Sequence, residues 1–206
     1  MSVDTAAGFT VTDPVGAPTS TYDAFSAIDI VVEFEDNLGS NAGWTTENVD
    51  MLDGEWEANP EVPAGAGDRG DPTTDFDGNG MCYLTDNAAG NTDVDGGPTR
   101  LISPVYDLTS YTDPSMSYAR WFTNDDNDAD RLDVEISNNG GSTWTLVESA
   151  GNASGWVEVQ FRVADYVTPT ANVRLRFSAT DNPNDSVTEA GVDTIRIINV
   201  VCDTCL

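Results

Sequence analysis

Short runs in which apolar and polar residues alternate constrain this chain more than any other feature. In one of them Leu132, Val134 and Ile136 alternate with Asp133, Glu135 and Ser137. Similar runs, β-branched or aromatic and bounded by turn residues, occupy 156–163, 172–177, 28–35, 100–103, 115–122, 143–148 and 192–200. This period of two is typical of strands with one buried and one wet face, the habit of antiparallel sheets.

No window shows a helical stripe with caps, and the segment 37–98 is rich in Gly, Asp and Pro with few strands. We therefore predict an all-β antiparallel β-sandwich, a jelly roll with long acidic loops concentrated in its first half. The predicted sandwich spans residues 27–200. Residues 1–26 are an N-terminal extension or partial strand, and residues 201–206 are a C-terminal Cys-x-x-Cys linker.

The charge excludes several functions. The formal net charge is −28, the eight basic residues are all Arg, and there is no His. Such a surface would repel nucleic acid and anionic membranes, and no apolar segment is long enough to insert into a membrane. The lack of His and Lys removes His-based triads and Schiff-base chemistry, and carboxylate pairs among 36 acids carry no specificity for a glycosidase. We expect no enzyme.

The segment 75–86 has the spacing of a calcium loop. Asp75, Asp77 and Asn79 fall at positions 1, 3 and 5, Gly80 at position 6 and Asp86 at position 12. Calcium requires six to eight oxygen ligands, and alternate residues of a tight loop can point three of them inward. Position 12 is Asp instead of the usual Glu, and the flanks indicate loop and strand instead of helix. A polar turn before a strand is the alternative.

Three more acidic clusters lie in predicted loops: Asp93 with Asp95, the segment 125–130, and the segment 181–185. Each taken alone is better explained as a solvated loop. Together they favour bound calcium, because a chain with so few cations has few other ways to offset dense carboxylates.

Trp44 and Trp56 lie in the loop-rich first half and are candidate ligand-binding residues, since aromatic faces stack on sugar rings. The segment 137–144 predicts a hairpin with an Asn-Gly-Gly turn and Trp144 packed over it. The three cysteines, Cys82, Cys202 and Cys205, leave the disulfide state open.

An ordered set of short motifs resembles bacterial extracellular jelly-roll modules of MAM-like or concanavalin-like type. Such modules are appended to secreted metallopeptidases and subtilisin-like peptidases. The motifs are 32–36 with 43–44, 54–57, 93–97, 101–108, 117–122, 132–144, 165–167, 173–179 and 189–193. The C-terminal segment 202–206 also resembles linkers of modular proteins of planctomycete type.

This resemblance implies a non-catalytic accessory domain of a larger secreted protein. It also implies a structural calcium between an acid on the first strand, Glu33 or Glu35, and Asp193 on the last. We therefore expect a calcium-stabilised extracellular adhesion or substrate-targeting module. Its partner is a glycan or a protein. The alternatives are a carbohydrate-binding module and a surface-layer or filament subunit that binds copies of itself.

Overall fold

The computed structural model describes residues 9–10, 21–22, 28–63, 70–126, 129–183 and 185–202. The strands are β1 (Phe9–Thr10), β2 (Thr21–Tyr22), β3 (Ile28–Asp36), β4 (Thr45–Asn48), β5 (Met51–Asp53), β6 (Tyr83–Leu84), β7 (Asp95–Ile102), β8 (Ser115–Asn124), β9 (Leu132–Ser137), β10 (Thr145–Ala150), β11 (Val157–Arg162), β12 (Arg174–Asp181) and β13 (Thr188–Cys202). A short 3-10 helix covers Val163–Asp165. No helix in the described ranges is long and apolar enough to cross a membrane.

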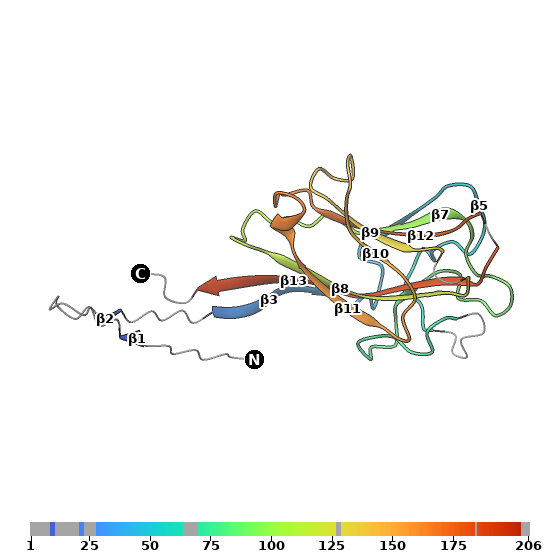
Figure 1. The fold of residues 1–206 in the computed structure, drawn as a ribbon, viewed down its shortest axis with the longest axis horizontal. Helices are drawn as coiled ribbons and strands as arrows, with labels where there is room; N and C mark the ends of the chain where they lie inside the picture. The colour runs from blue at the N-terminus through green and yellow to red at the C-terminus, as the bar shows by residue number, and fades with distance from the viewer. Residues whose placement is uncertain are drawn as a thin grey trace.

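Two antiparallel sheets face each other (Figure 1). One sheet has the strand order β10-β9-β12-β7-β4, with β5 also paired to β7. The other has the order β11-β8-β13-β3, with β6 also paired to β13. The prediction of an all-β antiparallel sandwich is confirmed, and the architecture is jelly-roll-like. The small strands β4, β5 and β6 lie in the segment where the sequence predicted mostly loop.

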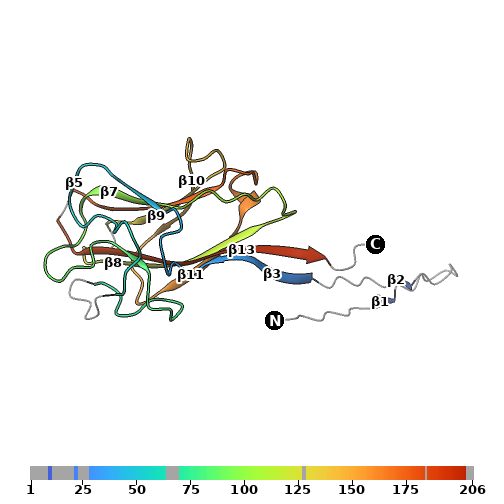
Figure 2. The same cartoon turned by 180° about the vertical axis from the view of Figure 1, so that it is seen from behind.

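Strands β3 and β13 continue beyond the rest of the sandwich as a paired ribbon (Figures 1 and 2). The pairing of β13 with β8 ends at Ile198, whereas its pairing with β3 continues to Cys202. β1 and β2 pair only with each other, outside the two sheets. The domain boundaries at residues 27 and 200 stay a prediction.

The core lies between the sheets, where the alternating residues of each strand meet. Val134 on β9 and Phe177 on β12 are fully buried opposite Tyr118 on β8. The rings of Tyr118 and Phe177 meet edge to face at 5.2 Å, which ties the two sheets together. At the margin the Tyr118 hydroxyl donates to Glu148, which also pairs with Arg120. The alternation in the sequence therefore predicts the inner faces correctly.

Candidate functional site

Three carboxylates from distant parts of the chain meet at one side of β13. Asp75, Asp77 and Asp193 each offer an oxygen, and these atoms all lie within 4.8 Å of one another. The loop that carries Asp75 and Asp77 is held by its own side chains, since the backbone N–H of Gly80 donates to Asp75 at 2.8 Å. We call this group the first acidic triad. It links a loop to a strand more than a hundred residues later.

A β-bulge in β13 accompanies Asp193 in this triad. The register of β13 against β8 shifts between Asp193 and Arg196, and Thr194 has a φ of 43°. Bulges of this kind redirect a side chain out of the regular alternation. The backbone N–H groups of Phe76 and Thr194 donate to the Asp193 carboxylate at 2.8 and 2.7 Å. Asp193 is therefore fixed from both the loop and the strand.

Burial raises the pKa of the Asp193 carboxyl to about 6. The bond from Phe76 opposes this change, and the charge of Asp77 adds to it. Asp193 is fully buried, whereas Asp77 is exposed. Because its pKa stays below 7, Asp193 is mostly ionised at neutral pH and carries a charge that a cation would offset.

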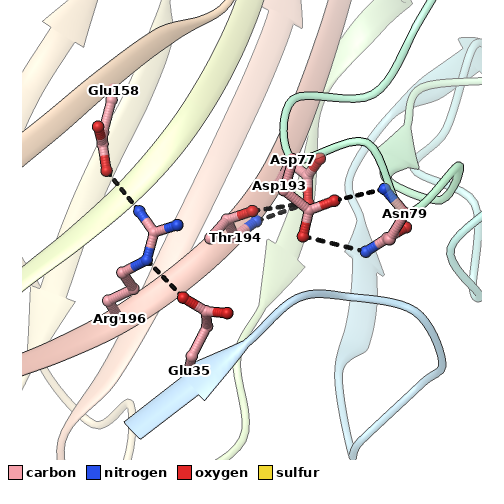
Figure 3. Close-up of polar contacts among 7 residues, drawn as sticks. All are labelled: Glu35, Asp77, Asn79, Glu158, Asp193, Thr194 and Arg196. Carbon is pink, nitrogen blue, oxygen red and sulfur yellow. Dashed lines mark hydrogen bonds and ion pairs between the residues drawn. The ribbon is translucent and has the colours of Figure 1, made fainter. Parts of the chain in front are cut away.

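The acids that the resemblance placed on the first strand do not reach Asp193. Glu35 lies opposite Arg196 in the register, and the Arg196 guanidinium donates to Glu35 and to Glu158, at 2.6 Å in each case. Figure 3 shows that the ion pairs of Arg196 are separate from the contacts between Asp77 and Asn79 in the loop. Glu33 is exposed on β3. The link between β3 and Asp193 is thus replaced by a link between Asp193 and the loop at 75–77.

The remaining residues of the predicted calcium loop take other positions. The side-chain amide of Asn79 donates to Asp77 at 3.1 Å, and its oxygen accepts from the N–H of Met81. Asp86 lies beyond β6, which pairs with β13 and carries the chain away in extended form at about 3.3 Å per residue. An EF-hand loop turns back so that position 12 reaches the ion, and a strand at this place prevents that.

A second acidic triad joins Asp93 and Asp95 to Asp181. Their oxygens also lie within 4.8 Å of one another. Asp93 and Asp181 are 1% and 3% exposed, so two of the three carboxylates are buried. The pairing of Asp181 with Gly96 brings the end of β12 beside the start of β7. A cavity of about 290 Å³ opens here, with Asp95 and Asp181 in its wall.

Two buried acids, one of them in the second triad, were not among the predicted ligands. Asp181 has a pKa raised to about 6, chiefly by burial and also by Asp130, against the effect of the Ser186 N–H. Glu189 is 1% exposed and accepts a bond from the Thr85 hydroxyl at 2.6 Å. Burial, with the charge of Asp71, raises the pKa of Glu189 to about 9. The sequence held one signal, because Asp181 continues the inward-facing series Leu175, Phe177 and Ala179.

The structure corrects the prediction for Trp44 and Trp56. Each side chain is 3% exposed, so neither can offer a ring face to a sugar. The Trp44 ring packs near Tyr83 and Phe177, and its indole N–H donates to Asp36 at 3.0 Å. The long segment 37–63 therefore supplies large core residues between its turns, and a loop-rich sequence around a Trp does not ensure its exposure.

Cys82 is the cysteine whose side chain the structure describes, and it belongs to neither triad. Cys82 is a free, fully buried thiol, and burial raises its pKa, with the nearby Asp193 adding to the effect. Residues 203–206, with Cys205, lie outside the described residues. Both triads thus present oxygen donors alone, and such buried acidic groups can hold a metal ion.

No protein-family model matches the sequence, and the comparison with curated proteins finds no match. Solved structures do match. The K1 cleaved adhesin domain of Lys-gingipain from Porphyromonas gingivalis W83 has a TM-score of 0.51 and 14% identity, over 82% of this chain and 96% of that one.

A structure from work on carbohydrate-binding modules of the β-sandwich superfamily has a TM-score of 0.52 and 15% identity, over 96% of this chain and 74% of that one. At these identities the likeness establishes the fold alone. By structure, the chain is a β-sandwich similar to an adhesin domain and to a carbohydrate-binding module.

Proposed function

We propose that this chain is a non-catalytic binding module that calcium stabilises, and that it serves as an adhesion or substrate-targeting part of a larger secreted protein. The observation that carries the proposal is the convergence of two carboxylate triads in a fold similar to adhesin and carbohydrate-binding domains. Each triad joins a loop to a strand that is remote in sequence. A cation there would hold together parts that otherwise repel each other.

The donor set fits calcium. Each triad supplies three carboxylates and no nitrogen or sulfur atom, which is the chemistry of a hard cation. The remaining oxygens of a six- to eight-coordinate ion would come from backbone carbonyls and water. When bound, calcium would supply charge neutralisation and a cross-link. No chemical step is assigned to it.

Calcium should raise the melting temperature. We expect a gain of about 5–10 °C in excess calcium over EDTA, because an ion that binds only the folded state stabilises it by mass action. Differential scanning calorimetry measures the shift, and titration calorimetry should give two ions per chain. Magnesium is the control, and it should act more weakly, since it prefers a stricter geometry with retained water. An unchanged melting temperature would reject the calcium proposal.

The same proposal implies that the module binds a partner outside the cell, either a glycan or a protein. Binding to a carbohydrate is favoured by the match to a carbohydrate-binding module over 96% of the chain. The rival is assembly with copies of the chain. Sedimentation velocity with calcium separates the two, because a mass that grows with calcium would select assembly.

A further inference from the structure

The outer face of the six-stranded sheet has a composition unlike the rest of the molecule. Its position is defined by the alternation, because Leu101, Val134 and Phe177 point into the core and their neighbours point outward. The register places these outward residues in rows across β4, β7, β12, β9 and β10. One row is Thr45, Ile102, Arg176, Glu135 and Leu146, and the next is Glu47, Arg100, Ser178, Asp133 and Ser149.

This outer face balances its charge, although the whole chain carries −28. The Arg100 guanidinium pairs with Glu47 at 2.7 Å, and Arg176 donates to Glu135 at 2.7 Å. The charged groups on the face are three arginines and three carboxylates: Arg100, Arg174, Arg176, Glu47, Glu135 and Asp133. A balanced face selects neither a cation nor a polyanion, and the remaining acidity of the molecule would repel the latter.

Several hydrogen-bonding groups on this face have no partner among the described residues. Ser178 is 9% exposed, and its hydroxyl forms no hydrogen bond. In the register it lies directly between Arg100 and Asp133, whose Nε and Oδ1 atoms are also buried without a partner. Buried polar groups in folded proteins are nearly always satisfied. A small rotation of these side chains would let a ligand or solvent rich in hydroxyl groups satisfy them.

Arg174 is a further hydrogen-bonding group on this face that lacks a partner among the described residues. Its guanidinium has no ion pair or hydrogen bond with any described residue, and its Nε is buried. The other described arginines all have an acceptor. An arginine without a carboxylate is unexpected in so acidic a chain. It leaves a planar set of donors available on the face.

A stacked pair of planar groups, Trp144 and Arg176, lies beside these donors. Trp144 ends the Asn-Gly-Gly hairpin and is half-buried, just before the pairing of Thr145 with Ile136. The guanidinium carbon of Arg176 lies 4.4 Å from the centroid of the Trp144 ring. Cation–π packing of this kind holds both groups in place. An aromatic edge next to unsatisfied donors and acceptors is the chemistry that recognises sugar rings and their hydroxyls.

We propose that the outer face of the six-stranded sheet binds an uncharged glycan chain, with Trp144 and Arg176 as the stacking edge and Arg174, Ser178 and Asp133 as hydrogen-bonding groups. The inference deepens the proposed function, since it names the ligand class and the binding face of the module. It does not depend on calcium, because neither triad lies on this face.

Affinity gel electrophoresis tests the proposal with the full chain. The probes are neutral polysaccharides cast in the gel (arabinoxylan, mixed-linked β-glucan, galactomannan and hydroxyethylcellulose), with polygalacturonate as the anionic probe. At least one neutral probe should retard the wild-type chain, and the retardation should persist at roughly 1 M NaCl, where charge attraction is screened. Polygalacturonate should not retard it.

Two substitutions test whether the glycan binds to the outer face of the six-stranded sheet. Arg174→Gln and Trp144→Ala should each weaken binding by about tenfold or more, as expected for one lost charged hydrogen bond or stacking contact. Arg162→Gln is the matched control, because Arg162 lies on β11 in the other sheet and pairs with Asp113 and Asp165. It should bind as the wild type does. Melting temperatures show that each variant is folded, and Arg174→Gln remains decisive if Trp144→Ala is not.

Three results would overturn the proposal: no retardation by any neutral probe, retardation by polygalacturonate alone, or equal retardation of Arg174→Gln and the wild type. The calcium proposal is tested separately. If a neutral probe retards the chain but calcium does not change its melting temperature, the metal sites are rejected and the glycan-binding face stands. Calcium-dependent melting without retardation would do the reverse.

Discussion

Asp193 shows how one residue acquires its environment from neighbours on two elements. The N–H groups that bind it come from Phe76 in a loop and Thr194 in the β13 bulge. The carboxylate of Asp77 lies on the same loop as Phe76, and its charge raises the pKa of Asp193. Glu35 is near in the strand register but is occupied by Arg196. Contact with the loop, not sequence pattern on the strands, decides which acid meets Asp193.

Replacing Asp193 should therefore remove much of the response to calcium. In Asp193→Asn we expect the calcium-induced rise in melting temperature to fall by about half, because one of two triads loses a charged ligand. In EDTA the free energy of unfolding should change by no more than about 1–2 kcal/mol, since relief of a desolvated charge offsets a lost hydrogen bond.

Glu35→Gln is the control for this experiment. It removes a carboxylate from an exposed ion pair, and such pairs contribute about 0–1 kcal/mol. Its calcium response should equal that of the wild type. If Glu35→Gln lost the response as Asp193→Asn does, the site would link β3 to Asp193, as the family resemblance implies.

At the scale of elements, the second triad depends on how closely β5 approaches the chain before β7. Gly54 follows β5 with a φ of 71°, a left-handed conformation that favours glycine. A Cβ at Gly54 would lie 2.4 Å from the backbone carbonyl of Asp93 and from the nitrogen of Val94. The absence of a side chain thus allows Asp93 to pack where it meets Asp95 and Asp181.

Gly54→Ala should disturb this approach. We expect a loss of stability of about 2–4 kcal/mol, from backbone strain and from displacement of the Asp93 segment. Titration calorimetry should show one calcium ion per chain in place of two.

Gly140→Ala is matched for backbone strain. Gly140 has a φ of 72° in the hairpin between β9 and β10, and a Cβ there would meet nothing within 4 Å. This variant should lose only about 1–2 kcal/mol and keep both ions. Two ions bound by Gly54→Ala would show that Asp93 is not a ligand.

At the scale of the whole molecule, some of the acidic side chains that give the chain its formal charge of −28 lie in the interior. Two calcium ions would offset four units of it. Without a cation, the raised pKa values mean that the folded chain retains protons that the unfolded chain releases. The pKa of Glu189 is about 9 against 4.5, and the pKa values of Asp181 and Asp193 are about 6 against 3.8. Stability therefore falls as pH rises between the unfolded and folded pKa values.

In EDTA the melting temperature should drop by about 5–10 °C from pH 5 to pH 8. Excess calcium should flatten or reverse this trend, because protons compete with the metal for the triads. Glu189→Gln should reduce the slope in EDTA above pH 7, where Asp181 and Asp193 are already largely ionised. A slope that does not change in this variant would show that Glu189 is not the group that titrates. Thermal scans across the pH range measure all three effects.

Much of the fold follows from local sequence. The alternation in 132–137 and 174–177 predicts strands with a buried face, and both form as expected because burial of alternate side chains needs no distant information. The strands β4, β5 and β6 have weak patterns, since each is short and is defined by its pairing with β7 or β13. The local sequence does not predict the burial of Trp44, because the rings beside it, Tyr83 and Phe177, are distant in the chain.

The sequence by itself determined the class of the molecule: an acidic, all-β chain whose alternating strands build an antiparallel sandwich and whose carboxylates gather between strands. Only the tertiary structure decided which carboxylates meet. Asp193 joins Asp75 and Asp77, and Asp181 joins Asp93 and Asp95, across separations of about a hundred residues. The physical reason is that alternation is a local consequence of strand geometry, whereas a triad is formed by register, bulges and loop closure between distant segments.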